Sequence, residues 1–357
     1  MKKKLLVTGG AGFIGSAVVD RALIKGYKVI NVDSLTYAGS KKNISNFIND
    51  KNHEFVLADV RSRDSIANIF SKYKPDAVIH LAAETHVDRS LKDPTTFADT
   101  NINGTLSLLE VVRSYLSKKG SPENFRFINV STDEVYGSLK GSGKFTEVHP
   151  HCPSSPYSAS KAAAEDLVNA WIQTYGLPAI TTRCSNNFGP RQYPEKLVPL
   201  TIANAFQLRP IEIYGNGQNV RDWIYVLDHA DALLEILSKG RSKHCYNIGA
   251  NAEFTNNDLV DLICKIMDKL RPMAVKHANL VTFIADRPGH DYRYALNTDK
   301  IETELSWKPK FSFERSLHET VKWYLDQFKS RSSWVKNRSA QNLLKHDPIN
   351  QTMSLVK

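Results

Sequence analysis

The sequence lacks the features that would place it in a membrane or in a secretory pathway. Its 357 residues contain no apolar run near the roughly 20 residues that a membrane-spanning helix requires. The basic residues that follow Met1 lead into only three apolar residues before Thr8, too few for the apolar region of a secretory signal. A cytoplasmic location with no membrane partner is therefore predicted.

Cysteine is scarce as well. Only four cysteines are present, they are far apart, and none forms a Cys-x-x-Cys pair. This pattern predicts reduced structural thiols rather than a disulfide framework or a zinc site. The eleven histidines include no His-x-x-x-His pair, so no protein-bound metal is expected.

The charge balance is basic, with 47 lysines and arginines against 37 acidic residues and a formal net charge of +10. Such an excess can favour anionic partners, nucleic acids included. No basic cluster is interleaved with aromatic residues, however, so nucleic-acid binding is not predicted. An anionic small substrate accounts for the excess equally well.

Short apolar strands alternate with helix-like segments through the first half of the chain. Strands are expected at residues 5–7, 28–32, 54–58, 77–81 and 125–130, and helices at 13–25 and about 62–73. This alternation implies a parallel sheet with helices on both faces. The predicted fold class is α/β, a Rossmann-like doubly wound parallel sheet with a smaller mixed α/β substrate-binding lobe.

The organisation changes after about Phe188, where prolines and a Tyr-Gly-Asn-Gly turn at residues 214–217 interrupt the pattern. We expect a first domain over residues 1–187, with returning segments around 220–250, and a second domain mainly over 188–328. The polar, weakly periodic residues 329–357 are expected to be a C-terminal extension or tail.

A glycine-rich loop lies between the first strand and the first helix. Gly9, Gly12 and Gly15 fit a dinucleotide-binding fingerprint, as do Gly10, Gly12 and Gly15, and Phe13 and Ile14 open the helix. Glycine is needed because the turn is tight and the backbone must approach a diphosphate closely. The free N–H groups and positive dipole of the helix N-terminus then bind that anion.

An acidic residue decides which dinucleotide is expected. Asp33 ends the second strand, 18 residues after Gly15, where a carboxylate can accept hydrogen bonds from the ribose hydroxyls of adenosine. The same charge repels a 2′-phosphate, so NAD is the predicted cofactor. The predicted NAD site is completed by Ser34, Asp59, Val60, Leu81, Ala82, Ala83, Thr100, Tyr157, Lys161 and Asn187.

Tyr157 and Lys161 are four residues apart, on one face of a predicted helix. A phenol normally titrates near ~10, so it is a poor base at neutral pH. A nearby ammonium and a cationic nicotinamide ring are expected to lower the pKa of Tyr157. Tyr157 would then take a proton from a substrate hydroxyl. The arrangement resembles the extended branch of the short-chain dehydrogenase/reductase superfamily.

The segment Thr132-Asp133-Glu134 follows a predicted strand and carries two adjacent acids. Two such groups can serve as an acid and a base when their surroundings separate their pKa values. Dehydration of a hexose needs both, because a base removes the C5 proton and an acid protonates the departing C6 oxygen. Glu134 is the predicted base and Asp133 the predicted acid, while Thr132 is predicted to orient the C4 hydroxyl with Tyr157.

Several long blocks of the sequence resemble dTDP-glucose 4,6-dehydratases, in the order that this family shows. They lie at residues 81–90, 131–137, 184–190, 194–200, 220–226 and 286–291. The resemblance implies a lyase that acts on a nucleotide sugar, and a homodimer that pairs a helix near residues 103–117 with the helix carrying Tyr157. The predicted nucleotide-sugar ligands are Glu84, His86, Asn186, Glu195, Lys196, Leu197, Tyr214, Arg221, Asn256, Arg287 and His290.

Two departures from the family pattern leave the substrate open. Phe188 stands where tyrosine is usual, and Arg191 is more typical of neighbouring sugar-nucleotide families. UDP-glucose and UDP-N-acetylglucosamine therefore remain alternatives to dTDP-glucose. A sugar-nucleotide 4-epimerase or a decarboxylase would share the glycine loop and the Tyr/Lys pair, but neither explains Asp133. A non-catalytic NAD-binding scaffold would be expected to lack the catalytic residues.

Overall fold

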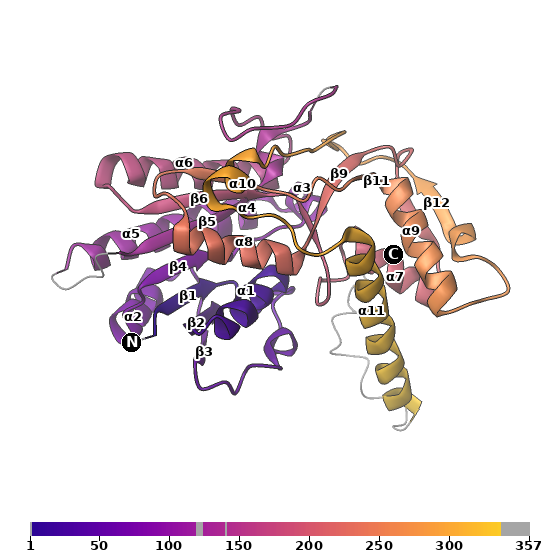
Figure 1. Ribbon diagram of the computed structural model, residues 1–357, viewed down its shortest axis with the longest axis horizontal. Coiled ribbons are helices and arrows are strands. Elements are labelled where there is room, and N and C mark those ends of the chain that lie inside the picture. Colours follow the sequence, from indigo (N-terminus) through magenta and orange to yellow (C-terminus); the bar gives the residue numbers. More distant parts are fainter. Residues whose placement is uncertain (1, 119–123, 140, 337–357) are drawn as a thin grey trace. The chain divides into compact units, whose positions relative to one another are not determined.

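The structure is a computed structural model that describes residues 2–118, 124–139 and 141–336, with side chains up to residue 330. The chain divides into two compact units, which are described separately here (Figure 1). The first unit comprises residues 1–187, 220–253 and 287–310, and the second 188–219, 254–286 and 311–357. The structure of residues 1, 119–123, 140 and 337–357 lies outside the described part.

A seven-stranded sheet forms the centre of the first unit, in the order β10-β6-β5-β4-β1-β2-β3. Every pair of neighbouring strands in it is parallel. The strands are β1 (Lys4–Thr8), β2 (Lys28–Asp33), β3 (His53–Leu57), β4 (Ala77–His80), β5 (Arg126–Thr132), β6 (Ala179–Cys184) and β10 (Cys245–Ile248). The strand order reverses between β1 and β4, so the carboxyl ends of those strands form the crevice where doubly wound folds bind ligands. The predicted fold class is confirmed.

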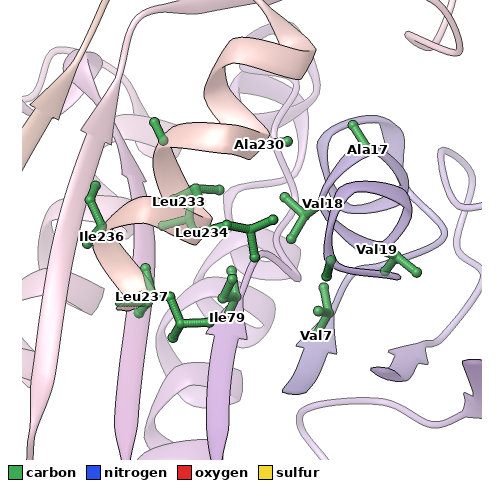
Figure 2. Packing of buried hydrophobic residues seen from close by; sticks show 14 of the residues in the cluster. Val7, Ala17, Val18, Val19, Ile79, Ala230, Leu233, Leu234, Ile236 and Leu237 are labelled. Atoms are coloured by element: carbon green, nitrogen blue, oxygen red, sulfur yellow. The ribbon is translucent and has the colours of Figure 1, made fainter. Parts of the chain in front are cut away.

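Alternating side chains of the strands fill two cores, one on each face of this sheet. Leu5 and Val7 of β1 contribute to the core shared with helices α1 (Phe13–Ile24) and α8 (Val226–Lys239). Figure 2 shows Val7 and Ile79 beside apolar residues of these two helices. Leu6 points to the opposite core, which is completed by α2 (Arg63–Tyr73), α5 (Gly104–Leu116) and α6 (Pro156–Tyr175). This period of two places helices on both faces, as a doubly wound sheet requires.

The start of α6 is defined by its sequence. Ser155 is the N-cap, and its side chain accepts a hydrogen bond from the Ser158 N–H while the Ser158 hydroxyl accepts one from the Ser155 N–H. Pro156 occupies the first helical position, where its missing N–H costs nothing. Tyr157 is therefore held in the first turn of a well-capped helix.

The remaining elements of the first unit connect the sheet to its surface. They are η1 (Lys41–Ile44), α3 (Val87–Lys92), α4 (Pro94–Phe97), the π-helical segment η2 (Ala98–Asn103), η3 (Asp133–Tyr136), β9 (Val220–Tyr225) and α10 (Asp299–Leu305). Two of the five boundaries between the units fall within the short strands β7 (Asn186–Phe188) and β11 (Glu253–Thr255).

The second unit packs three helices around aromatic and aliphatic side chains. Its elements are α7 (Leu197–Gln207), β8 (Ile211–Tyr214), α9 (Asn256–Leu270), η4 (His277–Leu280), β12 (Val281–Ile284) and α11 (Phe313–Lys336). Strands β8 and β12 pair in parallel. Phe254 stacks on Phe313 with ring centroids 4.4 Å apart, and Phe206 lies 5.0 Å from Phe328.

The predicted elements differ from the observed ones mainly at their ends. Strand β5 runs to Thr132, two residues beyond the predicted end, so the strand itself carries the first residue of the Thr-Asp-Glu segment. Helix α11 continues through the boundary expected at residue 329 to Lys336, and the rest of the predicted tail lies outside the described residues. None of the described helices is long and apolar enough to cross a bilayer.

Candidate active site at the carboxyl edge of the sheet

The glycine loop connects β1 to α1 at the centre of this edge. Gly9 has a φ of +72°, and a Cβ atom there would lie 2.7 Å from the Ala82 nitrogen. A Cβ atom on Gly15 would lie 2.0 Å from the Gly9 carbonyl oxygen. Both positions therefore exclude any larger residue. Helix α1 begins at Phe13 with Gly12 as an N-cap that has no side-chain hydrogen bond, so its first N–H groups suit a diphosphate.

Asp33 supports this loop from the end of β2. It is only 8% exposed, and its carboxylate accepts hydrogen bonds from the N–H groups of Ala11 (2.9 Å) and Leu35 (2.7 Å). Burial raises the pKa of Asp33, and these backbone hydrogen bonds oppose the rise. The acid thus orients the glycine loop and still has lone pairs for ribose hydroxyls. The neighbouring Ser34 is exposed.

The glycine loop and Asp33 together fit NAD. Because only glycine fits at positions 9 and 15, backbone atoms rather than side chains surround the N-terminus of α1. Asp59 and Val60 follow β3, but the Asp59 carboxylate is engaged by the Arg61 guanidinium at 2.6 Å. Leu81, Ala82 and Ala83 follow β4, all half-buried.

The π-helical segment η2 forms hydrogen bonds with the residues that follow β4 and with α6. It contains Thr100 and the buried Asn101, whose side-chain amide donates to the Glu84 carbonyl (3.0 Å) and to the Ser160 hydroxyl (2.9 Å). The Glu84 N–H donates to the Asn101 side-chain oxygen at 2.9 Å. Single π-helical turns occur often at functional sites. The sequence prediction missed Asn101, because only its spatial position distinguishes it from other asparagines.

Tyr157 and Lys161 both lie in the interior, at 7% and 6% exposure. The Lys161 ammonium donates a hydrogen bond to the Val130 carbonyl oxygen of β5, at 2.8 Å. Burial lowers the pKa of Lys161 to about 8. The ring of Tyr157 meets Phe97 edge to face, with centroids 6.3 Å apart. Helix α6 and its neighbours therefore fix both side chains.

The expected lowering of the Tyr157 pKa is not found in the chain by itself. Burial raises the pKa of Tyr157 well above its ordinary value, and the charge of Glu134 raises it further. A hydrogen bond with Thr132 opposes the rise. Burial is the largest cause of the rise, and the Lys161 ammonium donates its hydrogen bond to the Val130 carbonyl oxygen.

Asp133 and Glu134 occupy distinct environments in η3, directly after β5. Asp133 is 2% exposed, and its Oδ2 atom has no hydrogen-bond partner among the described residues. Burial and the charge of Glu134 raise the pKa of Asp133 well above its ordinary value, so a proton is retained there. Glu134 is half-buried, and its N–H donates to the Thr132 hydroxyl at 3.3 Å. One carboxyl is thus kept neutral beside another, as acid–base chemistry requires.

A cluster around Arg221 faces the two acids. The Arg221 guanidinium donates to the carbonyl oxygens of Val220 (2.8 Å), Asp291 (2.8 Å) and Tyr292 (3.2 Å), and lies 4.4 Å from the centroid of the Tyr294 ring. Its charge lowers the pKa of Asp133, against the larger effect of burial. The Tyr294 hydroxyl donates to the Asp291 carboxylate at 2.5 Å. Asp291 belongs to the block at residues 286–291 that resembles the family, whereas nothing in the sequence indicated a role for Tyr294.

Other predicted ligands in the first unit differ in their surroundings. The Arg287 guanidinium lies 3.2 Å from the Asp88 carboxylate. Glu84 is 7% exposed, burial raises its pKa, and its Oε2 atom has no hydrogen-bond partner among the described residues. His86 is the N-cap of α3 and accepts from the Arg89 N–H. Asn186, Asn187 and His290 are half-buried.

The other predicted sugar-nucleotide residues belong to the second unit. All are half-buried, and they lie at the ends of its elements. They are Glu195 and Lys196 before α7, Leu197 at its first position, Tyr214 at the end of β8 and Asn256 at the start of α9. The Asn256 N–H donates to the Asn219 carbonyl oxygen at 3.1 Å.

The arrangement on the first unit combines a buried neutral acid, a neighbouring carboxyl, a phenol and a buried ammonium. In the described part of the chain, no group of three or more His, Cys, Asp or Glu residues could hold a metal ion.

Known proteins share this chain's sequence over nearly its full length. The family model described as GDP-mannose 4,6 dehydratase matches residues 6–320. The dTDP-glucose 4,6-dehydratase of Salmonella typhimurium is 49% identical, over 94% of this chain and 95% of the relative.

This chain belongs to the dTDP-glucose 4,6-dehydratase family. The resemblance predicted from the sequence is thereby confirmed. The family member from Escherichia coli is 48% identical, again over 94% of this chain and 95% of its own length.

Solved structures of this dehydratase family share the fold. The dTDP-glucose 4,6-dehydratase of Streptomyces venezuelae, crystallised with NAD bound, is 41% identical with a TM-score of 0.84. The match covers 92% of this chain and 98% of that structure. A UDP-glucose 4-epimerase from Thermotoga maritima is 32% identical with a TM-score of 0.80, over 91% and 99% of the two chains. The fold is therefore common to dehydratases and epimerases, and the residues of the site must separate them.

Proposed function

We propose that this chain catalyses the NAD-dependent dehydration of dTDP-glucose to the 4-keto-6-deoxy sugar nucleotide. The observation that carries the proposal is the buried Asp133, with its raised pKa, beside Glu134 at the carboxyl end of β5. An epimerase needs no acid at C6, so a protonated carboxyl held in this position favours water elimination. The names of the relatives and the NAD bound in the Streptomyces venezuelae enzyme support the same activity.

In the first step Tyr157, with Thr132 beside it, takes the proton of the C4 hydroxyl. NAD, when bound, supplies hydride transfer, first from C4 and later to C6. The Lys161 ammonium adds positive charge behind the phenol and is fixed by the Val130 carbonyl. Gly9, Gly12, Gly15 and Asp33 would hold the cofactor, with Thr100 and Asn187 as further proposed contacts.

Elimination follows from the two acids. The C4 ketone makes the C5 proton acidic, and Glu134 removes it as a base and returns a proton to C5 when C6 accepts the hydride. Asp133 gives its proton to the C6 oxygen, which leaves as water. Burial raises the pKa of Asp133 and so favours the protonated form, which is the form that donates to the departing C6 oxygen.

Substrate binding is proposed for residues of each unit. In the first unit, Arg221 and Arg287 offer planar guanidinium groups suited to a diphosphate, and Glu84, His86, Asn186 and His290 offer polar groups suited to sugar or base. In the second unit the proposed ligands are Glu195, Lys196, Leu197, Tyr214 and Asn256. We assign NAD binding to residues 1–187 with the segments around 220–250, and nucleotide-sugar binding mainly to 188–328.

The decisive experiment incubates purified protein with dTDP-glucose, UDP-glucose or UDP-N-acetylglucosamine, without added NAD, and analyses the products by mass spectrometry. A product lighter by one water molecule is expected, formed fastest from dTDP-glucose. Asp133→Asn should reduce product formation by about 100-fold or more, because the acid is lost. A C4 stereoisomer of unchanged mass would instead identify an epimerase.

A homodimer through α5 and α6 is also proposed. Four apolar residues of α5, Leu108, Leu109, Val111 and Val112, are buried in the chain's own core, so they are not available to a partner. Support comes from a cavity at the surface of these two helices. It is lined by Arg63, Asn103, Leu106, Ser107, Glu110, Arg113, Trp171 and Tyr175.

The half-buried Leu106 gives a direct test of this surface. Leu106→Arg should convert the protein to a monomer in light-scattering measurements. Ile24→Arg, which changes an exposed apolar residue on α1, should leave the mass unchanged. A wild-type protein of monomer mass would refute the proposed dimer.

A further inference from the structure

A buried ion pair joins β6 to α6, a helix that packs on the face of the sheet opposite α1. Arg183 of β6 is 6% exposed and Glu165 of α6 is fully buried. The Arg183 Nη2 and Nε atoms donate to the Glu165 Oε2 atom at 2.7 and 3.0 Å. None of the steps proposed above uses either residue.

Both members of the pair are ionised. Burial alone would raise the pKa of Glu165, but hydrogen bonds with His151 and Arg183 outweigh it and lower that pKa. The Nε2 atom of His151 lies 3.2 Å from the Glu165 carboxylate, and its Nδ1 atom 3.3 Å from that of Asp166. Burying two charges is costly even when they are paired, so stability by itself is a weak reason for their presence.

Arg183 also contacts the segment that carries the catalytic acids. Its guanidinium lies 4.6 Å from the centroid of the Tyr136 ring. Tyr136 is the last residue of η3, two positions after Glu134, and is 3% exposed. Its ring stacks on Phe145 at 4.8 Å, and its hydroxyl donates to the Asn247 side chain at 2.8 Å. The short helix η3 therefore ends in a tyrosine that contacts Arg183, Phe145 and Asn247.

The strand register brings the same pair next to the start of η3. Arg183 is opposite Ser131 in the β5–β6 ladder, one residue before Thr132. Glu165 follows Lys161 by one turn of α6. The ion pair thus connects α6 and β6 to the turn that contains Asp133 and Glu134.

We propose that Arg183, anchored by Glu165, is a positioning residue that fixes the Asp133–Glu134 turn through its contact with the Tyr136 ring. This inference rests on the function proposed above. Tyr157 lies in the capped first turn of α6, whereas η3 is only four residues long and ends at Tyr136. Loss of the Arg183 contact therefore slows elimination of water at C5 and C6 and leaves oxidation at C4 largely intact. A misplacement of about 1 Å is enough to reduce a catalytic rate by roughly 100-fold.

The test compares two variants that disturb the contact in different ways. Arg183→Lys keeps a positive charge near Glu165 but removes the planar group over Tyr136. Tyr136→Leu removes the ring and leaves the ion pair intact. Tyr136→Phe keeps the ring and loses only the hydroxyl. Arg21→Met is the matched control, because Arg21 forms a comparable pair with Asp231 (2.6 and 2.9 Å) between α1 and α8.

Single-turnover reactions with dTDP-glucose follow the absorbance of the reduced cofactor and, by mass spectrometry, the dehydrated product. In Arg183→Lys and Tyr136→Leu the reduced cofactor should form at close to the wild-type rate and accumulate, while the product forms about ten-fold or more slowly. Their double variant should be no slower than the worse single variant, since both act through one contact. Tyr136→Phe should keep most of the product rate, and Arg21→Met should change only the melting temperature.

An unchanged ratio of reduced cofactor to product in both variants, with a lowered melting temperature alone, would overturn the inference and leave the pair a structural one. If Arg183→Lys does not fold, Tyr136→Leu decides the question, because its ion pair is intact. Failure of the wild-type protein to form a dehydrated product would instead refute the proposed function itself.

Discussion

The Lys161 ammonium lies 2.8 Å from the carbonyl oxygen of Val130, in the interior of the first unit. Four residues earlier on the same helix, Tyr157 has a pKa raised by burial and by Glu134. The lysine is therefore fixed by strand β5, one turn of α6 after Tyr157. Because this ammonium is buried, the pKa of Lys161 differs between the folded and the unfolded chain.

Removing Lys161 should alter how stability depends on pH. Burial lowers its pKa in the folded chain to about 8, below the ordinary 10.5, so between these values the unfolded chain binds more protons. Stability therefore rises with pH in that window. Relative to Lys161→Met, the free energy of unfolding of the wild-type protein should increase by about 2 kcal/mol between about pH 8 and pH 10. Urea unfolding followed by circular dichroism measures this, and parallel pH curves for the two proteins would contradict it.

Asp133→Asn should stabilise the protein increasingly as the pH rises above about 4. The folded-state pKa of Asp133 is raised by burial, so the native chain keeps a proton that the unfolded chain releases. Stability is then lost as the pH rises toward the folded-state pKa, the opposite of the usual behaviour of a paired aspartate. Asparagine has no such proton. Melting temperatures from acid to neutral pH check this, and a gap between the two proteins that does not widen would show that Asp133 is ionised.

Thr132→Val should weaken Tyr157 as a base. The hydrogen bond with Thr132 lowers the pKa of Tyr157, so its loss moves the pKa further upward. We expect C4 oxidation at neutral pH to slow about ten-fold, the usual value of a hydrogen bond to a charged group, and its pH profile to shift to higher pH. Thr132→Ser keeps the hydroxyl and should retain the wild-type profile. Single-turnover formation of reduced cofactor gives both profiles, and a Val variant with the Ser profile would exclude this role.

Gly15→Ala should abolish NAD binding. A methyl group there would lie 2.0 Å from the Gly9 carbonyl oxygen, so the loop must shift, at a cost of about 3 kcal/mol. Gly26→Ala is the control, because nothing lies within 4 Å of the added methyl and only the strain of a φ of +86° is expected, about 1 kcal/mol. Binding is measured by the rise in melting temperature on adding NAD. An equal rise in both variants would place the diphosphate elsewhere.

The sequence by itself determined the alternating strands and helices, the glycine loop, and the spacing of Tyr157 and Lys161. Each of these depends on local patterns, such as the continuous apolar run of β1 or the glycines that a tight turn requires. The pKa of Asp133 is different, because burial in the tertiary structure raises it, and residues distant in sequence act on it as well: the charge of Asp222 raises it and the charge of Arg221 lowers it.

Only the tertiary structure decided which partner each polar group has. A lowered pKa of Tyr157 was predicted for Lys161 acting together with a bound nicotinamide ring, whereas in the chain alone burial and the charge of Glu134 raise that pKa. The partner of Lys161, the Val130 carbonyl oxygen of β5, could not be predicted from a local pattern. The Arg183–Glu165 pair and its contact with Tyr136 likewise join residues from three separate elements. Electrostatic energies depend on distance and burial in space, and sequence spacing fixes neither across a sheet.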